Sequence, residues 1–326
     1  MPDVSREVVA SLALLAALAA AALTAAALGE VYYINLASRI AIVALASVGL
    51  NLALGFGGMI SFGHAAFFGL GGYVAGIAAT HAVDGGAFAG VIPGTTWAIP
   101  IWGVAILLSA AVAVPIGLIS LRTEGVYFIM ITLAFAQMIY YFAISFPAYG
   151  GEDGLPIYVR SQLPLVRYGD PLVFFTVVFA WLVLVLLLMR MVLRARFGAA
   201  LTMARLNPLR LATSGVAPFP VRLTAYVLSA AITGLAGALF ADLNGFVGPS
   251  MLSWHRSGEI MVIVILGGVG RLAGPVAGAA ALVLLEVAIG GYTQYWQFVL
   301  GVVLLLVVLF ARGGLMGWLA GPPRHG

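Results

Sequence analysis

The fold class is decided by the stretch Pro171-Leu-Val-Phe-Phe-Thr-Val-Val-Phe-Ala-Trp-Leu-Val-Leu-Val-Leu-Leu-Leu-Met-Arg190, which carries no charged side chain before Arg190. A membrane-spanning helix needs about 20 consecutive apolar residues, and this stretch meets that length. Comparable runs occupy residues 8–28, 36–55, 98–119, 126–147 and 292–312. Barrel strands would alternate between apolar and polar residues, whereas these runs are continuous. The sequence therefore predicts an all-α, polytopic transmembrane helical bundle.

The composition excludes a soluble protein. Hydrophobic residues make up 63% of the 326 positions, charged residues only 8%, and mean hydropathy is +1.14, against about 25% charged residues in soluble domains. Cysteine is absent, which excludes disulfides and thiolate metal sites. The basic residues lie mainly in loops between apolar runs, a pattern typical of membrane orientation signals and not of nucleic-acid binding. Residues 1–326 are expected to form a single membrane domain.

The distribution of arginine predicts the topology. The loop at 190–222 holds six arginines and no Asp or Glu, so the positive-inside rule makes it cytoplasmic. Arg312 and Arg324 place the C-terminal tail on the same side. Later spans are expected at 223–243, 257–270, 274–290 and 292–312. Counting backwards places loops 81–97 and 148–170 outside and gives about ten spans, with both termini cytoplasmic.

Two glycine-rich segments, 55–73 and 245–270, each follow an apolar span. Both contain Gly-Phe-x-Gly, then a Ser and a His. In the predicted topology, the two preceding spans run in opposite directions. Similar units of opposite direction are typical of an inverted-topology repeat with broken helices near the solute site. The alternative is that the glycines only let helices pack closely.

Polar residues inside the predicted spans are costly in a bilayer and are candidates for a solute path. The candidates are Asn51, Ser61, His64, Thr132, Gln137 and Glu259. For Asn51, Thr132 and Gln137, hydrogen bonding between helices is an equally good interpretation. His64 is expected to face a cavity, because the helix is expected to break there. Asp242 and Glu286 lie near predicted span ends and are expected to be solvated.

Catalytic patterns are missing from the sequence. It contains no HExxH, GxSxG or P-loop motif, and its four His residues show no metal-ligand spacing. No catalytic residue, metal or cofactor is therefore expected, and the chain is not expected to be an enzyme. No relay of Asp, Glu and His suggests a proton-coupled pump, so any energy is expected to come from another subunit.

The cytoplasmic loop predicts a short helical hairpin. Helices are expected at 198–206 and 208–214, with a break at Asn207-Pro208 and a stop at Gly215. A compact basic hairpin between long spans is typical of a docking site for a cytoplasmic partner. Adhesion of its arginines to lipid phosphate at the membrane surface is the alternative, and the loop alone leaves both open.

Five blocks of sequence, in this order, resemble the permease subunits of branched-chain amino acid ABC importers, particularly the M-type subunit. The blocks are 49–73, 121–135, 150–155, 229–239 and 265–275, and the resemblance extends over about residues 36–318. It implies a multi-pass protein of the bacterial inner membrane, surrounded by membrane lipid. It also implies four kinds of component: this chain, a second related permease, two cytoplasmic ATPase subunits that bind the ATP, and a periplasmic or lipid-anchored solute-binding protein. No nucleic-acid partner is implied.

The resemblance assigns residues 198–216 as the loop that couples to an ATPase. Its expected coupling residues are Ala204, Arg205, Leu206, Asn207, Pro208, Leu211 and Gly215. The chain departs from the family here, because the usual acidic run is missing and Pro208 is an addition. Related permeases for urea and short amides share much of the pattern, so the solute stays open.

The hypothesis for function is a permease subunit with alternating access, in which solute passes between this chain and its partner. The expected translocation-path residues are Asn51, Ser61, Phe62, His64, Phe67, Tyr127, Thr132, Gln137 and Glu259. The alternative is a secondary transporter or channel that works alone.

Overall fold

The computed structural model of this chain describes residues 2–88, 92–163, 169–291, 295–310 and 313–321. Within that part of the chain, seven helices are long and apolar enough to cross a membrane. They are α1 (Pro2–Ala27), α2 (Val31–Asn51), α3 (His64–Asp84), α4 (Ala98–Ser120), α5 (Val126–Ile144), α6 (Pro171–Arg194) and α9 (Pro218–Asn244). The prediction of a multi-span helical bundle is confirmed.

Three shorter helices occupy the places of the last three predicted spans. They are α10 (Trp254–Gly267), α11 (Gly274–Gly290) and α12 (Trp296–Phe310), and α13 (Gly314–Ala320) follows. The 14 residues of α10 rise only about 21 Å at 1.5 Å per residue, less than the hydrocarbon core of about 30 Å. Positions 292–294 and 311–312 of the predicted last span lie outside the described residues.

Local capping chemistry sets where α6 begins. The Asp170 side chain accepts a hydrogen bond from Leu172 N at 3.0 Å, and Pro171 occupies the first position of α6. An Asp cap satisfies a free N–H group, and proline has none to satisfy. The long apolar run quoted above therefore becomes helical from Pro171 onward.

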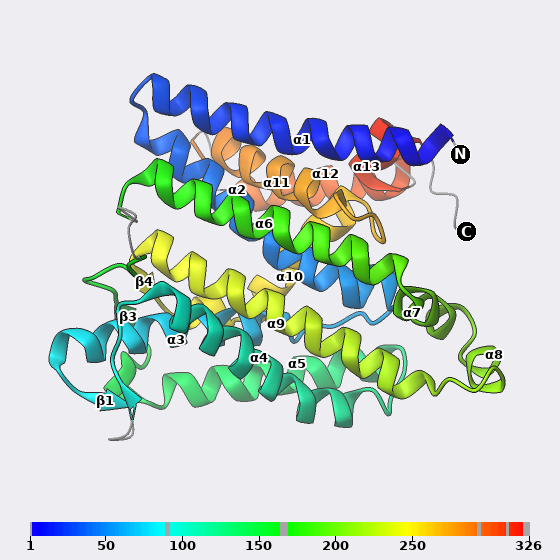
Figure 1. The fold of residues 1–326 in the computed structure, drawn as a ribbon, viewed down its shortest axis with the longest axis horizontal. Helices are drawn as coiled ribbons and strands as arrows, with labels where there is room; N and C mark the ends of the chain where they lie inside the picture. Colours follow the sequence, from blue (N-terminus) through cyan, green and yellow to red (C-terminus); the bar gives the residue numbers. More distant parts are fainter. Residues whose placement is uncertain (1, 89–91, 164–168, 292–294, 311–312, 322–326) are drawn as a thin grey trace.

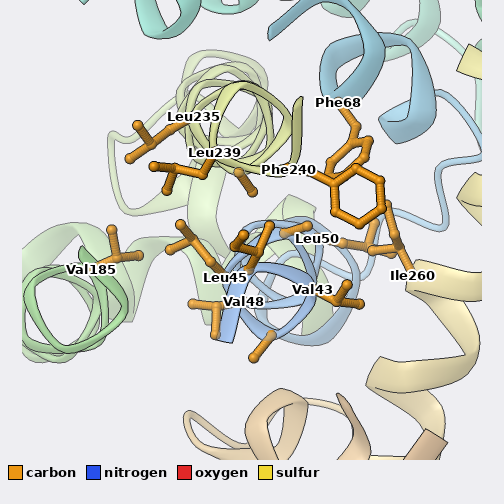
Figure 2. Close-up of a cluster of buried hydrophobic side chains, with 14 of the residues drawn as sticks. Val43, Leu45, Val48, Leu50, Phe68, Val185, Leu235, Leu239, Phe240 and Ile260 are labelled. Carbon is orange, nitrogen blue, oxygen red and sulfur yellow. The ribbon is translucent and has the colours of Figure 1, made fainter. Parts of the chain in front are cut away.

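The core is built around α2, as Figure 2 shows. Val43, Leu45, Val48 and Leu50 of α2 lie among Val185 of α6, Leu235 and Leu239 of α9, and Ile260 of α10. Small residues bring the neighbouring backbones close. A Cβ added to Gly71 of α3 would collide with the carbonyl of Gly234 in α9, and such small-residue contacts are how membrane helices gain packing energy.

Both glycine-rich segments interrupt helices. The last turn of α2 widens into a π-helix at Leu52–Phe56, residues 57–63 are not helical, and α3 begins at His64. At its own end, α9 stops before Gly245, which has a φ of +63°. A short strand, β4 (Phe246–Val247), and a 3-10 turn (Pro249–Leu252) then lead into α10. In Figure 1, α2 and α9 run in opposite directions, as expected for the two units.

The bundle has two distinct ends (Figure 1). The hairpin end carries α7 (Arg196–Leu206), α8 (Pro208–Thr213), the start of α1 and α13. The strand end carries two antiparallel two-stranded sheets: β1 (Ala87–Phe88) with β2 (Ile92–Pro93), and β3 (Leu155–Pro156) with β4. Both termini of the described chain therefore lie on the side of the arginine-rich loop.

The predicted hairpin of two short helices is confirmed. Asn207 caps α8 by accepting a hydrogen bond at its Oδ1 from Arg210 N, at 3.0 Å. Gly215 has a φ of +86°, a conformation that stops a helix and that glycine adopts without strain. We call residues 196–215 the hairpin.

Candidate functional site

The breaks in the two glycine-rich units meet where α3 and α10 begin. Ser257 Oγ of α10 accepts a hydrogen bond from Ala65 N at 2.9 Å and donates one to Phe62 O at 2.7 Å. Phe62 N in turn donates to Thr132 Oγ1 of α5 at 3.3 Å. Because Phe62 bonds to both α5 and α10, it lies at the boundary that we call the α5–α10 seam, formed by α5, Phe62 and the first two turns of α10.

His64 joins three helices through a relay of hydrogen bonds. Its Nε2 lies 2.6 Å from Ser229 Oγ of α9, and Ser229 Oγ donates to Gly49 O of α2, also at 2.6 Å. A hydroxyl has one proton to donate, so His64 Nε2 must carry the proton of the first bond. The other ring nitrogen, Nδ1, is buried and has no hydrogen-bond partner among the described residues.

Aromatic rings enclose His64. The rings of His64, Phe67 and Tyr226 contact one another edge to face, with centroids 5.7–5.8 Å apart. All three side chains are fully buried, and edge-to-face pairs of this kind add packing energy. In this conformation His64 therefore lies inside the subunit and not on an open cavity.

Asn51 ties the end of α2 to the turn between α10 and α11. Its Nδ2 donates to Arg271 O at 2.8 Å, and its Oδ1 accepts from Gly270 N at 3.0 Å. Arg271 in turn donates to the carbonyls of Met316 and Gly321. Since Asn51 is 1% exposed, its amide holds this junction together, which is the interhelical role that the sequence left open.

The nine predicted path residues fall into a buried group and a more exposed group. Asn51, Ser61, His64, Phe67 and Thr132 are buried inside the subunit. Phe62, Gln137 and Glu259 are partly exposed, and Tyr127 at the start of α5 is 72% exposed. The amide nitrogen of Gln137 is enclosed without a partner in the described structure. Only the second group presents side-chain surface to a neighbouring molecule in this conformation.

Arg205, a predicted coupling residue, contacts the broken end of α2. Its Nη1 donates to Gly55 O, and its Cγ lies over Gly58, where an added Cβ would be 2.9 Å away. Arg222 at the start of α9 donates to Ala204 O at 2.7 Å. The hairpin is therefore bound to both α2 and α9.

The tip of the hairpin is exposed. Leu206 and Leu209 are 66% and 79% exposed, whereas Leu211 and Ala204 are buried against the bundle. Asn207 lies between the two exposed leucines and is itself exposed. The hairpin thus presents an apolar tip beyond the end of the long helices, where Figure 1 shows α7 and α8 protruding.

Two arginines form ion pairs inside the bundle that were not predicted from the sequence. Arg256 Nη1 lies 2.7 Å from Glu259 Oε2, three positions along α10. Arg39 Nη2 of α2 lies 2.7 and 2.9 Å from the two carboxylate oxygens of Glu286 in α11. The spacing of Arg256 and Glu259 on one helix face was a readable signal, but nothing local connects Arg39 with Glu286.

The expectation that Asp242 is solvated is wrong. Asp242 is 1% exposed, and its Oδ1 accepts a hydrogen bond from Ser161 Oγ at 2.8 Å. The loop after β3 folds over the end of α9 and covers the carboxylate, since Ile157 N bonds to Gly245 O at 2.9 Å. Glu286, expected to be solvated as well, is instead held in the ion pair with Arg39, with 24% of its side chain exposed.

No group of three or more His, Asp or Glu side chains is arranged to hold a metal ion within the described ranges. The site therefore consists of a buried junction of broken helices, a partly exposed seam and a protruding hairpin joined to the junction. In the junction, the Ser229 hydroxyl beside His64 is directed at Gly49 O, so this pair joins helices.

Comparison with known proteins gives one family and two relatives. The profile of the family described as "Branched-chain amino acid transport system / permease component" matches residues 32–308. The relatives are the high-affinity branched-chain amino acid transport system permease proteins LivM of Salmonella typhimurium and Escherichia coli. Each is 26% identical over 312 residues, covering 87% of this chain and 69% of the relative. No solved structure gives a significant match.

Proposed function

Because this chain belongs to the family of permease components of branched-chain amino acid transport systems, we propose that it is one transmembrane subunit of an ATP-driven importer in the bacterial inner membrane. Its solute is a branched-chain amino acid, as in the names of both relatives, or a similar small polar solute. Its partners are a second related permease, two cytoplasmic ATPases and a periplasmic or lipid-anchored solute-binding protein. The ATPases bind the nucleotide, so this chain needs no cofactor.

The observation that carries the proposal is the contact between the hairpin and the broken helix. The exposed leucines at the tip fit a partner in the cytoplasm, and Arg205 bonds to Gly55 O at the π-helical end of α2. From there Asn51 bonds to the turn at Gly270 and Arg271. A movement of the hairpin driven by ATP therefore reaches the turn after α10 through direct contacts.

The α5–α10 seam is the proposed surface along which solute passes, between this subunit and its partner permease. Phe62 and Glu259 lie on it with part of their side chains exposed. A charged side chain exposed to lipid tails costs several kcal/mol, which favours a face covered by protein or water. The buried residues His64, Ser61 and Thr132 hold the helix starts that shape this surface.

The coupling step predicts the effect of Arg205→Gln. The complex is co-expressed with its ATPases, partner permease and binding protein and reconstituted in vesicles. A hydrogen bond from a charged donor contributes about 1.5–3 kcal/mol, so its loss is expected to lower solute uptake and solute-stimulated ATP hydrolysis about tenfold. Arg194→Gln is the matched control, because Arg194 is exposed at the end of α6 and makes no side-chain hydrogen bond within the described structure.

Two results would contradict the proposal. Solute flux in vesicles that contain this chain alone, without ATPases, would make it a secondary transporter or channel. Unchanged recovery of the ATPases after deletion of residues 198–216 would remove the hairpin from the interface.

A further inference from the structure

Arg256 and Glu259 form an ion pair inside the bundle, and the proposed solute path gives Arg256 no role. Their helix, α10, begins at the junction of the two breaks, where Ser257 bonds to the start of α3. The Arg256 guanidinium carbon lies 5.6 Å from the ring centroid of Phe68 and 5.0 Å from that of Phe240. Figure 2 shows these two rings side by side, close to Ile260. The pair is therefore held between membrane-spanning helices and not on a terminal loop.

The two side chains of the ion pair differ in how firmly they are held in place. The Arg256 side chain is 18% exposed and rests on two aromatic faces, whereas the Glu259 side chain is 39% exposed. Cation–π contacts keep a guanidinium in place independently of its carboxylate partner. Within the described residues, Glu259 Oε2 bonds to Arg256, and no other ion pair of Glu259 occurs. Glu259 can therefore turn away from Arg256 without releasing the guanidinium.

Open space lies beside the pair. A Cβ added to Gly258 would meet no heavy atom within 4 Å, and Trp254, one turn earlier, is 49% exposed. Both partners of the ion pair also keep exposed surface, 18% of the Arg256 side chain and 39% of the Glu259 side chain. An unshielded charge pair is expensive against lipid tails, so this side of α10 favours contact with a polar solute.

An α-amino acid carries the complementary charges on one carbon. Its carboxylate matches the fork of the Arg256 guanidinium, and its ammonium group matches the Glu259 carboxylate. We infer that Arg256 and Glu259 open to bind the zwitterionic head group of an α-amino acid, with the carboxylate on Arg256 and the ammonium on Glu259. This inference rests on the proposed function and specifies the solute class of the same seam.

The exchange conserves charge pairing. Before binding, the two side chains neutralise each other; after binding, each is neutralised by one end of the solute, so no charge is left uncompensated in a medium of low dielectric constant. A neutral amide offers no charge to either side chain and leaves the pair closed. The pair therefore selects amino acids over urea and short amides.

Cysteine labelling tests the inference directly, because the chain has no cysteine. Gly258→Cys is introduced into the chain, which is purified with its partner permease and ATPases but without the solute-binding protein. The rate of reaction with a charged thiol reagent is measured at increasing concentrations of leucine. It is measured likewise with 4-methylpentanoate, which lacks the ammonium group, and with 3-methylbutylamine, which lacks the carboxylate. Leucine is expected to protect the cysteine, and neither analogue nor acetamide is expected to do so.

The pair variants are then added to this background. Arg256→Gln and Glu259→Gln are each expected to raise the leucine concentration for half-protection at least about tenfold, since each removes a charge-assisted contact. For Arg256→Lys, the leucine concentration for half-protection is expected to lie between that of the two Gln variants and that of the parent. The matched control is Glu286→Gln, which opens the ion pair with Arg39 on a different pair of helices and is expected to leave half-protection unchanged.

The outcomes separate the inference from the proposed function. Equal protection by leucine and by both analogues, or unchanged half-protection in Arg256→Gln and Glu259→Gln, overturns the inference even when ATP-driven uptake of leucine is intact. Absence of ATP-driven uptake in the parent complex overturns the proposed function, and the labelling still decides whether the pair binds a zwitterion. If Glu259→Gln fails to assemble, Glu259→Asp replaces it; this variant keeps the charge but draws the carboxylate back by one methylene, and it is expected to raise the leucine concentration for half-protection above that of the parent.

Discussion

At the scale of single residues, the junction at the end of α2 depends on the absence of a side chain at Gly55. Its carbonyl accepts from Arg205, and its Cα faces the Asn51 amide and the Gly270 backbone. Asn51, Gly55 and Gly270 are thus packed so closely that the side chains of Arg205 and Asn51 reach the bundle through backbone groups. Backbone atoms move only with their segments, which makes this junction suited to transmitting a displacement.

Gly55→Ala is expected to destabilise the protein. The new Cβ would collide with Asn51 Oδ1 and lie 2.5 Å from Gly270 N, and overpacking against backbone costs about 1–3 kcal/mol. Thermal unfolding in detergent would show this as a lower Tm. Gly103→Ala in α4 is the control, since its Cβ meets nothing within 4 Å; an equal loss of stability in both variants would contradict the account of the junction.

Among the helices, one charge pair joins two elements that are distant in the sequence. Arg39 and Glu286 lie 247 positions apart in sequence, yet they join α2 to α11 with 33% and 24% of their side chains exposed. Removing one partner leaves a charge in an apolar setting, whereas removing both leaves none. We therefore expect the pair to contribute little net stability while loss of one partner alone is costly.

Glu286→Gln is expected to lower the free energy of unfolding by about 1–3 kcal/mol, because Arg39 then lacks its carboxylate. The double variant Arg39→Leu, Glu286→Leu is expected to recover most of that loss, since neither charge remains. Denaturation of the double variant, of Arg39→Leu alone and of Glu286→Leu alone, compared with the parent, forms a double-mutant cycle. A double variant that is less stable than either single variant would show that the pair is net stabilising.

At the scale of the whole molecule, the two ends of the bundle differ in kind. The hairpin end combines both termini with the protruding α7 and α8, and the strand end carries the two small sheets (Figure 1). By the positive-inside rule the arginine-rich hairpin end is expected to face the cytoplasm. The strand end is then expected to face outward, where the proposed solute-binding protein would deliver solute.

This orientation predicts opposite labelling of two single-cysteine variants. Leu209→Cys, at a position 79% exposed on the hairpin, is expected to react with a membrane-impermeant thiol reagent in inverted vesicles only. Tyr158→Cys, at a position 83% exposed near β3, is expected to react in intact spheroplasts. Labelling of both from the same side would refute the orientation.

The local features of the candidate site could be predicted from the sequence one by one, but not the contacts between them. The hairpin break at Asn207 and the stop at Gly215 are local features, because a cap and a left-handed glycine act within one turn. The start of α3 at His64 follows from a glycine-rich break in the same way. The sequence could not show that Ser229 would bond to His64 or that Ser161 would cover Asp242, since these contacts join distant segments.

Sequence alone was enough to predict a bundle of membrane helices and a basic hairpin, and it offered two helix breaks as a hypothesis. The run 171–189 is sufficient for the first point, because hydropathy and span length are properties of one segment. Only the tertiary structure decided which polar groups are buried and which face the seam. Asn51 meets Arg271 220 positions away because Gly55, with no side chain, lets the end of α2 approach the Gly270 backbone. Such packing depends on all the helices at once, so no single stretch of sequence encodes it.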